Sequence, residues 1–104
     1  MPKLVASCRT NVMDGMVVTN ELSEKVQDAR AGVVEFLLLN HPLDCPICDQ
    51  AGECHLQDLS YEHGHYNTRT DFERRTFEKI DIGETIQLHM TRCILCYRLS
   101  LIHI

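Results

Sequence analysis

The sequence predicts a small α+β protein, because helix and strand signals occupy separate stretches of its 104 residues. Three features carry this prediction: one amphipathic helical pattern, one loop rich in cysteine, and a short extended segment after it. The length suits a single modest domain of roughly 100–150 residues. A hydrophobic fraction of 44% and a charged fraction of 24% are ordinary for a folded protein, whereas six Cys and six His are an unusual excess.

Composition also excludes several classes of partner. The formal net charge of −5 leaves no basic surface of the kind that binds nucleic acid. The longest uninterrupted apolar stretch, Phe36–Leu39, is far shorter than the roughly 20 residues of a membrane span, so no direct membrane insertion is expected. No glycine-rich nucleotide-binding loop is present either.

The first segment, residues 1–19, contains two short pieces with strand propensity, Leu4–Ala6 and Met16–Val18. Asp14 and Gly15 lie between them and form a dipeptide that is typical of tight turns. We therefore expect two short extended pieces joined through a turn.

The clearest helix signal lies before Asn40, where apolar residues recur at the 3.6-residue period. We expect these residues to form one apolar face: Leu22, Val26, Ala29, Val33, Phe36 and Leu37. Pro42 ends the pattern, because proline disfavours the helical conformation in the residue that precedes it.

Four potential metal ligands follow at once, with the spacing His-x3-Cys-x2-Cys-x5-Cys. This His/Cys ligand set consists of His41, Cys45, Cys48 and Cys54. A Cys-x-x-Cys pair directs two sulfurs from one turn toward a common centre, and Gly52 permits the unusual backbone that returns Cys54 to it. Pro42 and Pro46 stiffen the loop and reduce the entropy lost when a metal binds.

The donor types leave two metal cofactors open. Three cysteines and one histidine suit tetrahedral zinc, whose ligands commonly come as pairs from two separated segments. Here all four lie in one continuous loop, which favours a bulky 4Fe–4S cluster with one iron for each ligand. Three disulfides are the less favoured interpretation of six cysteines, since no secretory signal precedes them.

The remaining chain is predicted to hold a short helix, a surface connection and an extended hairpin. Residues 54–63 form the helix and the polar residues 64–79 the connection. Ile80–Ile82, Gly83 and Ile86–Met90 suggest an extended piece, a turn and a strand that lead to Cys93. Cys93 and Cys96 form a second Cys-x-x-Cys pair, which is incomplete because Leu99 stands where a ferredoxin-type run has its third cysteine. Cys8 stands alone, and composition equally allows a buried apolar thiol there.

At the loop, the sequence resembles a known family. Residues 40–58 read Asn-His-Pro-Leu-Asp-Cys-Pro-Ile-Cys-Asp-Gln-Ala-Gly-Glu-Cys-His-Leu-Gln-Asp. This stretch closely resembles the iron–sulfur region of the large peripheral-arm subunit of respiratory complex I, which is the G subunit of NADH–quinone oxidoreductase in bacteria and the 75-kDa subunit in mitochondria. The resemblance extends over nearly all of residues 3–98.

The resemblance implies cofactor ligands. It assigns a 4Fe–4S cluster to the His/Cys ligand set. Cys8, in Leu4-Val-Ala-Ser-Cys8, corresponds to the last of four ligands of a 2Fe–2S cluster. Cys93 and Cys96, in Met90-Thr-Arg-Cys-Ile-Leu-Cys-Tyr-Arg98, correspond to the start of a further 4Fe–4S motif. The other ligands of these two clusters do not occur in this sequence, so we expect both clusters only in the intact subunit.

The resemblance also implies a domain organisation. Residues 1–19 correspond to the end of a ferredoxin-like 2Fe–2S domain, and residues 20–64 to the 4Fe–4S domain that contains the His/Cys ligand set. Residues 65–98 connect to the second 4Fe–4S motif. The family continues past Arg98 with a cysteine and a basic or aromatic stretch, so we expect residues 99–104, which differ, to be a non-native tail of a fragment. Asn11 stands where relatives usually have proline.

For function, the resemblance implies relay of single electrons in NADH:quinone oxidoreductase, from the flavin subunit that oxidises NADH toward quinone, without substrate-transforming residues in this segment. The implied partners are other peripheral-arm subunits. The implied place is the cytoplasmic side of the bacterial inner membrane, or the matrix side in mitochondria. Two alternatives stay open: the equivalent module of an iron-only or NAD-linked hydrogenase or formate dehydrogenase, and a zinc-stapled interaction module.

Overall fold

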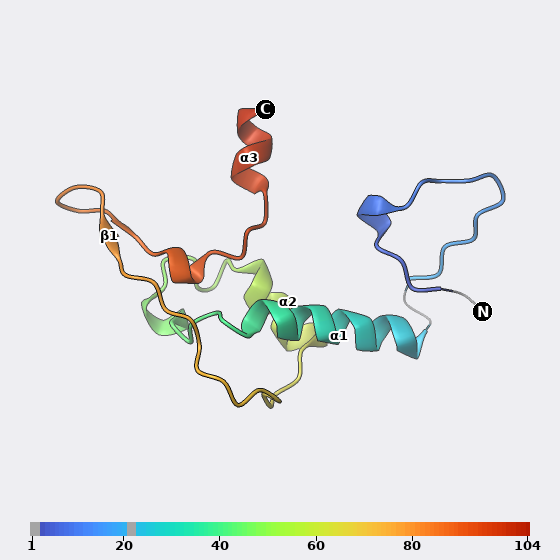
Figure 1. Cartoon of the computed structure of the whole chain (residues 1–104), viewed down its shortest axis with the longest axis horizontal. Coiled ribbons are helices and arrows are strands. Elements are labelled where there is room, and N and C mark those ends of the chain that lie inside the picture. Colours follow the sequence, from blue (N-terminus) through green and yellow to red (C-terminus); the bar gives the residue numbers. More distant parts are fainter. Residues whose placement is uncertain (1–2, 21–22) are drawn as a thin grey trace.

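The computed structural model describes residues 3–20 and 23–104, and the molecule is elongated (Figure 1). The α-helices of these ranges are α1 (Glu24–Leu38), α2 (His55–His63) and α3 (Arg98–His103), and the short 3-10 helices are η1 (Ser7–Arg9), η2 (Cys45–Ile47) and η3 (Met90–Arg92). Strands β1 (Ile80–Asp81) and β2 (Gln87–Leu88) pair antiparallel, with Ile80 opposite Leu88.

Helix α1 confirms the predicted amphipathic helix. It begins after Ser23, which has extended backbone angles, and it ends at Leu38, one residue before its C-cap Leu39. The chain then turns toward Pro42, which explains the stop, because the residue before a proline avoids the helical region. Leu22, the first residue of the predicted apolar face, lies outside the described residues.

The predicted apolar face of α1 is buried only in part: Val26 and Ala29 are half-buried. Ala31 and Val34 are the buried residues of the helix, whereas Val33 and Phe36 are 59% and 77% exposed. The C-terminal half of α1 is apolar on more than one side, so periodicity alone predicts two possible buried faces. Helix α2 packs on α1 and covers the side that carries Ala31 and Val34.

Helix α2 confirms the predicted short second helix. Cys54 is its N-cap, and the N–H of Asp58 donates to the Cys54 carbonyl at 3.0 Å. Leu56 is its buried residue, while Leu59 remains 42% exposed. Burial of Leu56 against α1 therefore sets where the first turn of α2, and with it Cys54, lies in the structure.

The connection from residue 64 to residue 79 is largely exposed, as predicted, and it returns along α1. The Arg69 guanidinium forms an ion pair and two hydrogen bonds with the Glu35 carboxylate of α1. The backbone N–H of Arg75 donates to Oδ1 of Asn40 at 3.1 Å. These contacts hold the connection beside the residues that precede the cysteine loop.

Of the predicted extended segments, the two N-terminal pieces form no strands, whereas the hairpin near residue 83 is present. Leu4–Ala6 and Met16–Val18 form no strands, although the Asp14–Gly15 turn is present and Gly15 has a φ of 74°. No hydrogen-bonded ladder joins these two pieces in the described residues. The predicted hairpin near residue 83 is confirmed by β1 and β2, between which Gly83 has a φ of 138°. The assignment of residues 1–19 to a ferredoxin-like domain stays a prediction.

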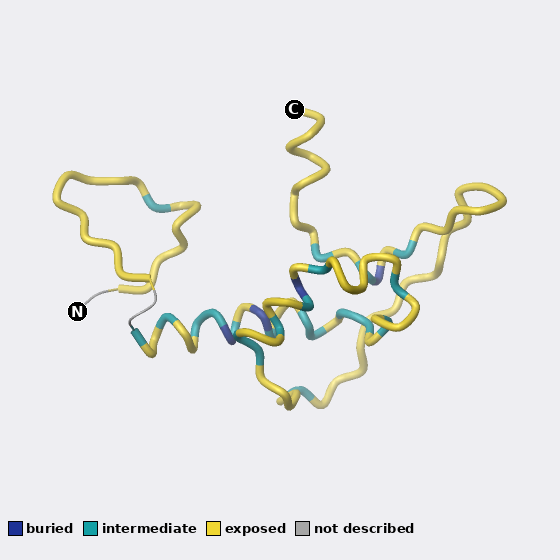
Figure 2. Tube along the Cα trace, turned by 180° about the vertical axis from the view of Figure 1, so that it is seen from behind, coloured by how far each residue is buried: buried dark blue, intermediate teal, exposed yellow. Residues whose placement is uncertain are grey.

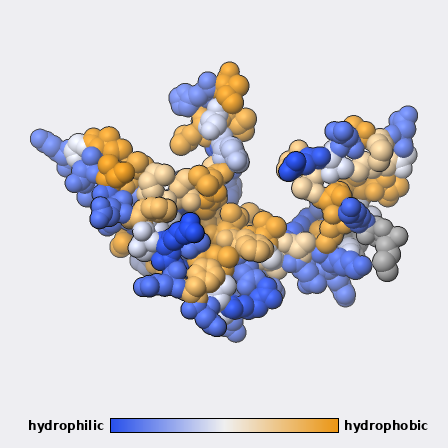
Figure 3. Space-filling view, viewed as in Figure 1, coloured by the Kyte–Doolittle hydropathy of each residue, from blue (hydrophilic) through white to orange (hydrophobic). Residues whose placement is uncertain are grey.

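The hydrophobic core is very small. Among the described residues, the buried hydrophobic side chains are Ala31, Val34 and Leu56 (Figure 2). The radius of gyration is 17.3 Å, compared with about 13 Å for a compact domain of 100 residues. Hydrophobic residues gather over the middle of the face shown in Figure 3. No helix in residues 3–20 and 23–104 has both the length and the hydropathy needed to cross a membrane.

Candidate metal centre

Every member of the His/Cys ligand set lies at or within three residues of the end of a helical element. His41 follows the end of α1, and its N–H donates to the Leu38 carbonyl at 3.3 Å. Cys45 is the first residue of η2, and Cys48 is its C-cap. Cys54 is the N-cap of α2. The helices therefore position the ends of the loop, while η2 positions the two central cysteines.

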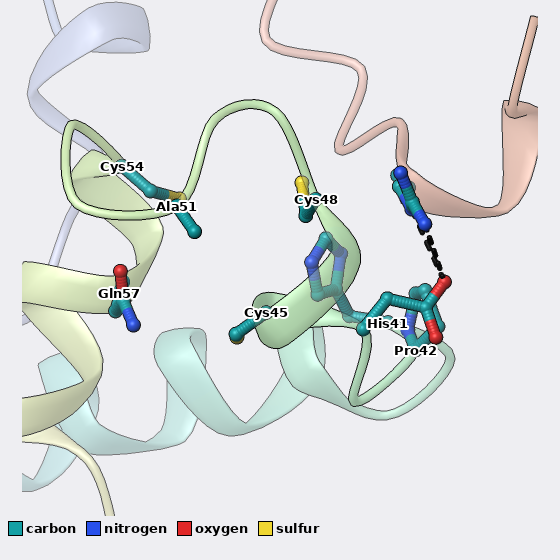
Figure 4. A pocket seen from close by; sticks show the side chains of 9 residues that line it. His41, Pro42, Cys45, Cys48, Ala51, Cys54 and Gln57 are labelled. Carbon is teal, nitrogen blue, oxygen red and sulfur yellow. Dashed lines mark hydrogen bonds and ion pairs between the residues drawn. The ribbon is translucent and has the colours of Figure 1, made fainter.

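These four side chains line one cavity. In Figure 4, Cys54 lies across the cavity from Cys48 and His41, and Cys45 lies below them. Cys45 is exposed, whereas His41, Cys48 and Cys54 are half-buried. Gln57 lies on the wall next to Cys54. The structure thus brings the whole predicted ligand set to one place.

Local backbone geometry explains how the loop returns to the cavity. The N–H of Cys48 donates to the Cys45 carbonyl at 3.3 Å, and that of Ala51 donates to the Cys48 carbonyl at 3.1 Å. Gly52 then has a φ of 86°, the left-handed region that the sequence predicted for it. Its N–H donates to Oε1 of Gln57 at 3.2 Å, which ties this turn to α2.

The electrostatics at His41 favour the form that binds a metal. Burial lowers the pKa of His41, because desolvation penalises the imidazolium. Asp44 opposes this effect, while the positive charges of Arg74 and Arg92 lower the pKa of His41 further. The imidazole is therefore neutral at pH 7, as a nitrogen ligand must be.

Sequence reasoning missed an ion pair at the cavity. Arg92 of η3 and Asp44 of the loop both line the cavity, and Nη2 of Arg92 lies 3.1 Å from Oδ2 of Asp44, a contact drawn dashed in Figure 4. Gln57 is a second missed contributor. Asp44 and Arg92 are 48 residues apart, so no local sequence pattern indicates that they meet.

The arrangement of donors fits a cluster. Zinc holds tetrahedral ligands at about 2.0–2.3 Å, so its ligands converge on one point. A 4Fe–4S cluster presents a different iron to each ligand, so its four ligands surround it and do not converge on one point. The partial positive charge at the N-terminus of α2 also favours a negative group beside Cys54.

The other three cysteines lie outside this cavity. Cys8, in η1, is exposed, so the alternative of a buried thiol is wrong. Cys93 and Cys96 are exposed too, and the N–H of Leu95 donates to Sγ of Cys93 at 3.5 Å. Cys93, but not Cys96, lines a second cavity, to which His41 also contributes. The cluster roles predicted for these cysteines stay predictions.

Comparison with known proteins identifies the region. A family model described as the NADH-ubiquinone oxidoreductase-G iron-sulfur binding region matches residues 30–69. The chain is 47% identical over 97 residues to the NADH-quinone oxidoreductase G subunit of Buchnera aphidicola, covering 92% of this chain and 10% of the relative. It is 50% identical over 96 residues to the corresponding protein of Rickettsia typhi, covering 92% of this chain and 14% of the relative.

A third relative, named as a 75 kDa subunit, matches a similar share of the chain. The chain is 53% identical over 98 residues to the NADH-ubiquinone oxidoreductase 75 kDa subunit of Reclinomonas americana, covering 93% of this chain and 14% of the relative. The chain thus spans between a tenth and a seventh of the length of these relatives. The matched model confirms the prediction of a 4Fe–4S cofactor for this region. The chain therefore belongs to the family of the NADH-quinone oxidoreductase G subunit and contains the iron–sulfur binding region of that family.

Proposed function

We propose that the chain is an electron-transfer segment of an NADH:quinone oxidoreductase, and that the His/Cys ligand set holds its 4Fe–4S cluster. When bound, such a cluster takes up and releases one electron at a time. The observation that carries the proposal is that all four predicted ligands line one cavity inside the matched region. The path runs from the NADH- and flavin-binding subunit toward quinone.

The residues of the site have distinct tasks in this proposal. The three cysteines supply thiolates, and His41 supplies a neutral nitrogen in place of a fourth thiolate. This replacement makes the cluster less negative, which is the change that raises the reduction potential in Rieske centres. Gly52, Pro42 and Pro46 shape the loop.

The surface of the chain supports a place within a larger assembly. Val33 and Phe36 expose much of their apolar side chains on α1, and contiguous exposed apolar surface commonly marks a protein interface. We propose that other parts of the intact subunit and neighbouring peripheral-arm subunits cover it. The assembly lies on the cytoplasmic side of the bacterial inner membrane, or on the matrix side in mitochondria.

We further propose that the outlying cysteines act only in the intact subunit. Cys8 completes the ligands of a 2Fe–2S cluster at the end of a ferredoxin-like domain, residues 1–19. Cys93 and Cys96 begin the second 4Fe–4S motif at the end of residues 65–98. Both proposals rest on the sequence match over these residues, not on the cavity.

Anaerobic reconstitution of the 104-residue chain with ferrous iron and sulfide tests the main proposal. We expect a brown protein with about four irons and four sulfides per chain, in line with one 4Fe–4S cluster, and a paramagnetic signal after reduction with dithionite. A colourless protein with one zinc, purified from cells competent in cluster assembly, would contradict the proposal and favour the zinc-stapled module.

Removal of single cysteines tests the ligand assignment. Cys48→Ala should abolish the stable cluster, because one iron loses its thiolate and the remaining three ligands hold the cofactor incompletely. Cys8→Ala is the matched control, since Cys8 lies in η1 away from the cavity, and its iron content should equal that of the unmodified chain. Unchanged iron in Cys48→Ala would show that the assignment is wrong.

A further inference from the structure

The ion pair between Asp44 and Arg92 joins the cysteine loop to a distant part of the chain. Nε of Arg92 donates to Oδ2 of Asp44 at 3.1 Å, and Nη2 lies 3.1 Å from the same oxygen. The side chains of Asp44 and Arg92 are only 28% and 21% exposed, respectively. Both line the cavity of the His/Cys ligand set, so two opposite and largely shielded charges lie at the wall of the cofactor site.

The backbone that carries Arg92 is held in place independently of this pair. The neighbouring Thr91 is 9% exposed, and its Oγ1 accepts a hydrogen bond from the N–H of Phe77 at 3.0 Å. Within η3, the N–H of Cys93 donates to the Met90 carbonyl at 3.0 Å. The guanidinium therefore reaches the cavity from an anchored segment, and it contacts the loop between His41 and Cys45.

A fixed charge at this wall affects a bound cluster through elementary electrostatics. Reduction adds one electron to the cluster, makes and breaks no bond, and increases its negative charge by one. A guanidinium stays protonated at any physiological pH, so a nearby Arg92 stabilises the reduced form more than the oxidised form. Asp44 has the opposite effect. Partial burial strengthens both effects, because less water screens them.

We propose that Arg92 positions the cluster loop and raises the reduction potential of its 4Fe–4S cluster, while Asp44 anchors Arg92 and lowers that potential. The proposal rests on the proposed function, since it concerns the cofactor of that site. The electron comes from a one-electron donor, for which dithionite stands in the experiment. Arg92 acts on the cluster through its charge and through Asp44, without being a ligand.

Two substitutions distinguish an effect of charge from an effect of the contact itself. Each removes one partner of the Asp44–Arg92 ion pair, but the charges removed have opposite signs. The 104-residue chain and its variants Arg92→Gln and Asp44→Asn are reconstituted anaerobically with ferrous iron and sulfide. Their reduction is followed by electron paramagnetic resonance at controlled potential. Arg92→Gln should lower the reduction equilibrium constant about threefold to tenfold and Asp44→Asn should raise it by a similar factor, which are shifts of roughly 30–60 mV for one electron.

Two further variants complete the design. Arg92→Lys keeps the positive charge but replaces the guanidinium, and it should retain most of the potential of the unmodified chain. Arg9→Gln removes one positive charge from the exposed η1 segment, away from the cavity, and it should leave the potential unchanged.

Each outcome decides the proposal. Shifts of the reduction potential in opposite directions in Arg92→Gln and Asp44→Asn support it. Shifts in the same direction, or no shift, overturn it, because both substitutions break the same contact and a purely structural role would change the potential in the same direction in both. If Arg92→Gln retains no cluster, a raised potential in Asp44→Asn together with a nearly unchanged potential in Arg92→Lys supports the proposal, and an unchanged or lowered potential in Asp44→Asn overturns it. An unmodified chain that binds no iron contradicts the proposed function instead, and iron content reports that result separately.

Discussion

At the residue scale, the site depends on side chains whose chemistry matches their local backbone. His41 follows α1 at the position where the chain leaves the helix, and burial keeps its imidazole neutral by lowering its pKa. Gly52 turns the loop with a φ of 86°. Cys54 caps α2. Each residue combines a structural task with its task toward the cofactor.

The titration of His41 in the cluster-free chain gives the first residue-scale prediction. Burial lowers the pKa of His41, so its midpoint should lie below the ordinary value of about 6.5. At pH values between the pKa of His41 in the folded chain and its ordinary value in the unfolded chain, the unfolded chain binds the proton and the folded chain does not. The free energy of unfolding therefore increases with pH in this range. Imidazole proton chemical shifts, followed by nuclear magnetic resonance, measure this midpoint.

Substitutions of the neighbouring charges test the cause of this pKa shift of His41. The negative charge of Asp44 raises the pKa of His41 and Arg92 lowers it, so Asp44→Asn should move the midpoint to still lower pH. Arg92→Gln should move the midpoint in the opposite direction. A midpoint above about 6.5 in the unmodified chain would contradict the description of His41 as a buried neutral imidazole.

Gly52→Ala tests the turn of the loop. A Cβ at this position meets no atom within 4 Å, so its cost comes only from the left-handed backbone, with φ of 86°. A cost of about 1–2 kcal/mol is expected for a non-glycine residue in that region. A chelator should remove iron faster from this variant than from the unmodified chain, as measured by the loss of the brown absorbance. Gly32→Ala, within α1, is the control and should not accelerate it.

At the element scale, packing of α2 on α1 determines where the far end of the loop lies. His41 lies three residues after the end of α1 and Cys54 is the N-cap of α2, so the distance between these ligands depends on the contact between the two helices. Leu56 is the buried residue of α2 in this contact. A change in helix packing therefore reaches the cluster site without altering any ligand.

Leu56→Ala should weaken both the helix pair and the cluster. Removal of a buried leucine side chain typically costs about 2–5 kcal/mol, and the low end of this range applies where the core is small. Thermal unfolding of the cluster-loaded chain, followed by circular dichroism, should show a lower midpoint temperature. Leu59→Ala is the matched control, because Leu59 is 42% exposed and its removal should change the midpoint little. Equal effects of both substitutions would contradict the described packing.

At the scale of the whole molecule, the described protein buries too few apolar side chains to be stable on that basis alone. Ala31, Val34 and Leu56 are the buried hydrophobic residues of the described part. The radius of gyration of 17.3 Å is correspondingly large. In a small protein of this kind, free energy of metal binding becomes free energy of folding, because the unfolded chain does not present the site.

Loading of the cluster should therefore protect the chain as a whole. The reconstituted chain should resist limited digestion by a glutamate-specific endopeptidase at Glu53, in the segment between α1 and α2, and it should do so more strongly than the cluster-free chain. Digestion followed by mass spectrometry measures the difference, with Cys48→Ala treated identically as the control. Equal cleavage of the loaded and cluster-free chains would show that the cofactor does not stabilise this fold.

Much of the local structure and the ligand set could be predicted from the sequence. Helical periodicity and a proline located α1, and the spacing of three cysteines and a histidine predicted a shared cofactor site, because such spacing requires only local geometry. The turn at Gly52 followed from the conformational freedom of glycine. These features depend on residues that are close in the chain.

Other features were decided only by the tertiary structure. The sequence could not show which face of α1 is buried, because Ala31 and Val34 compete with Val33 and Phe36, and the position of α2 selects between them. Nor could it show that Arg92 meets Asp44, since the two are separated by 48 residues. Periodicity and spacing describe neighbours along the chain, whereas the buried face and the charges at the cavity depend on which distant segments the fold brings together.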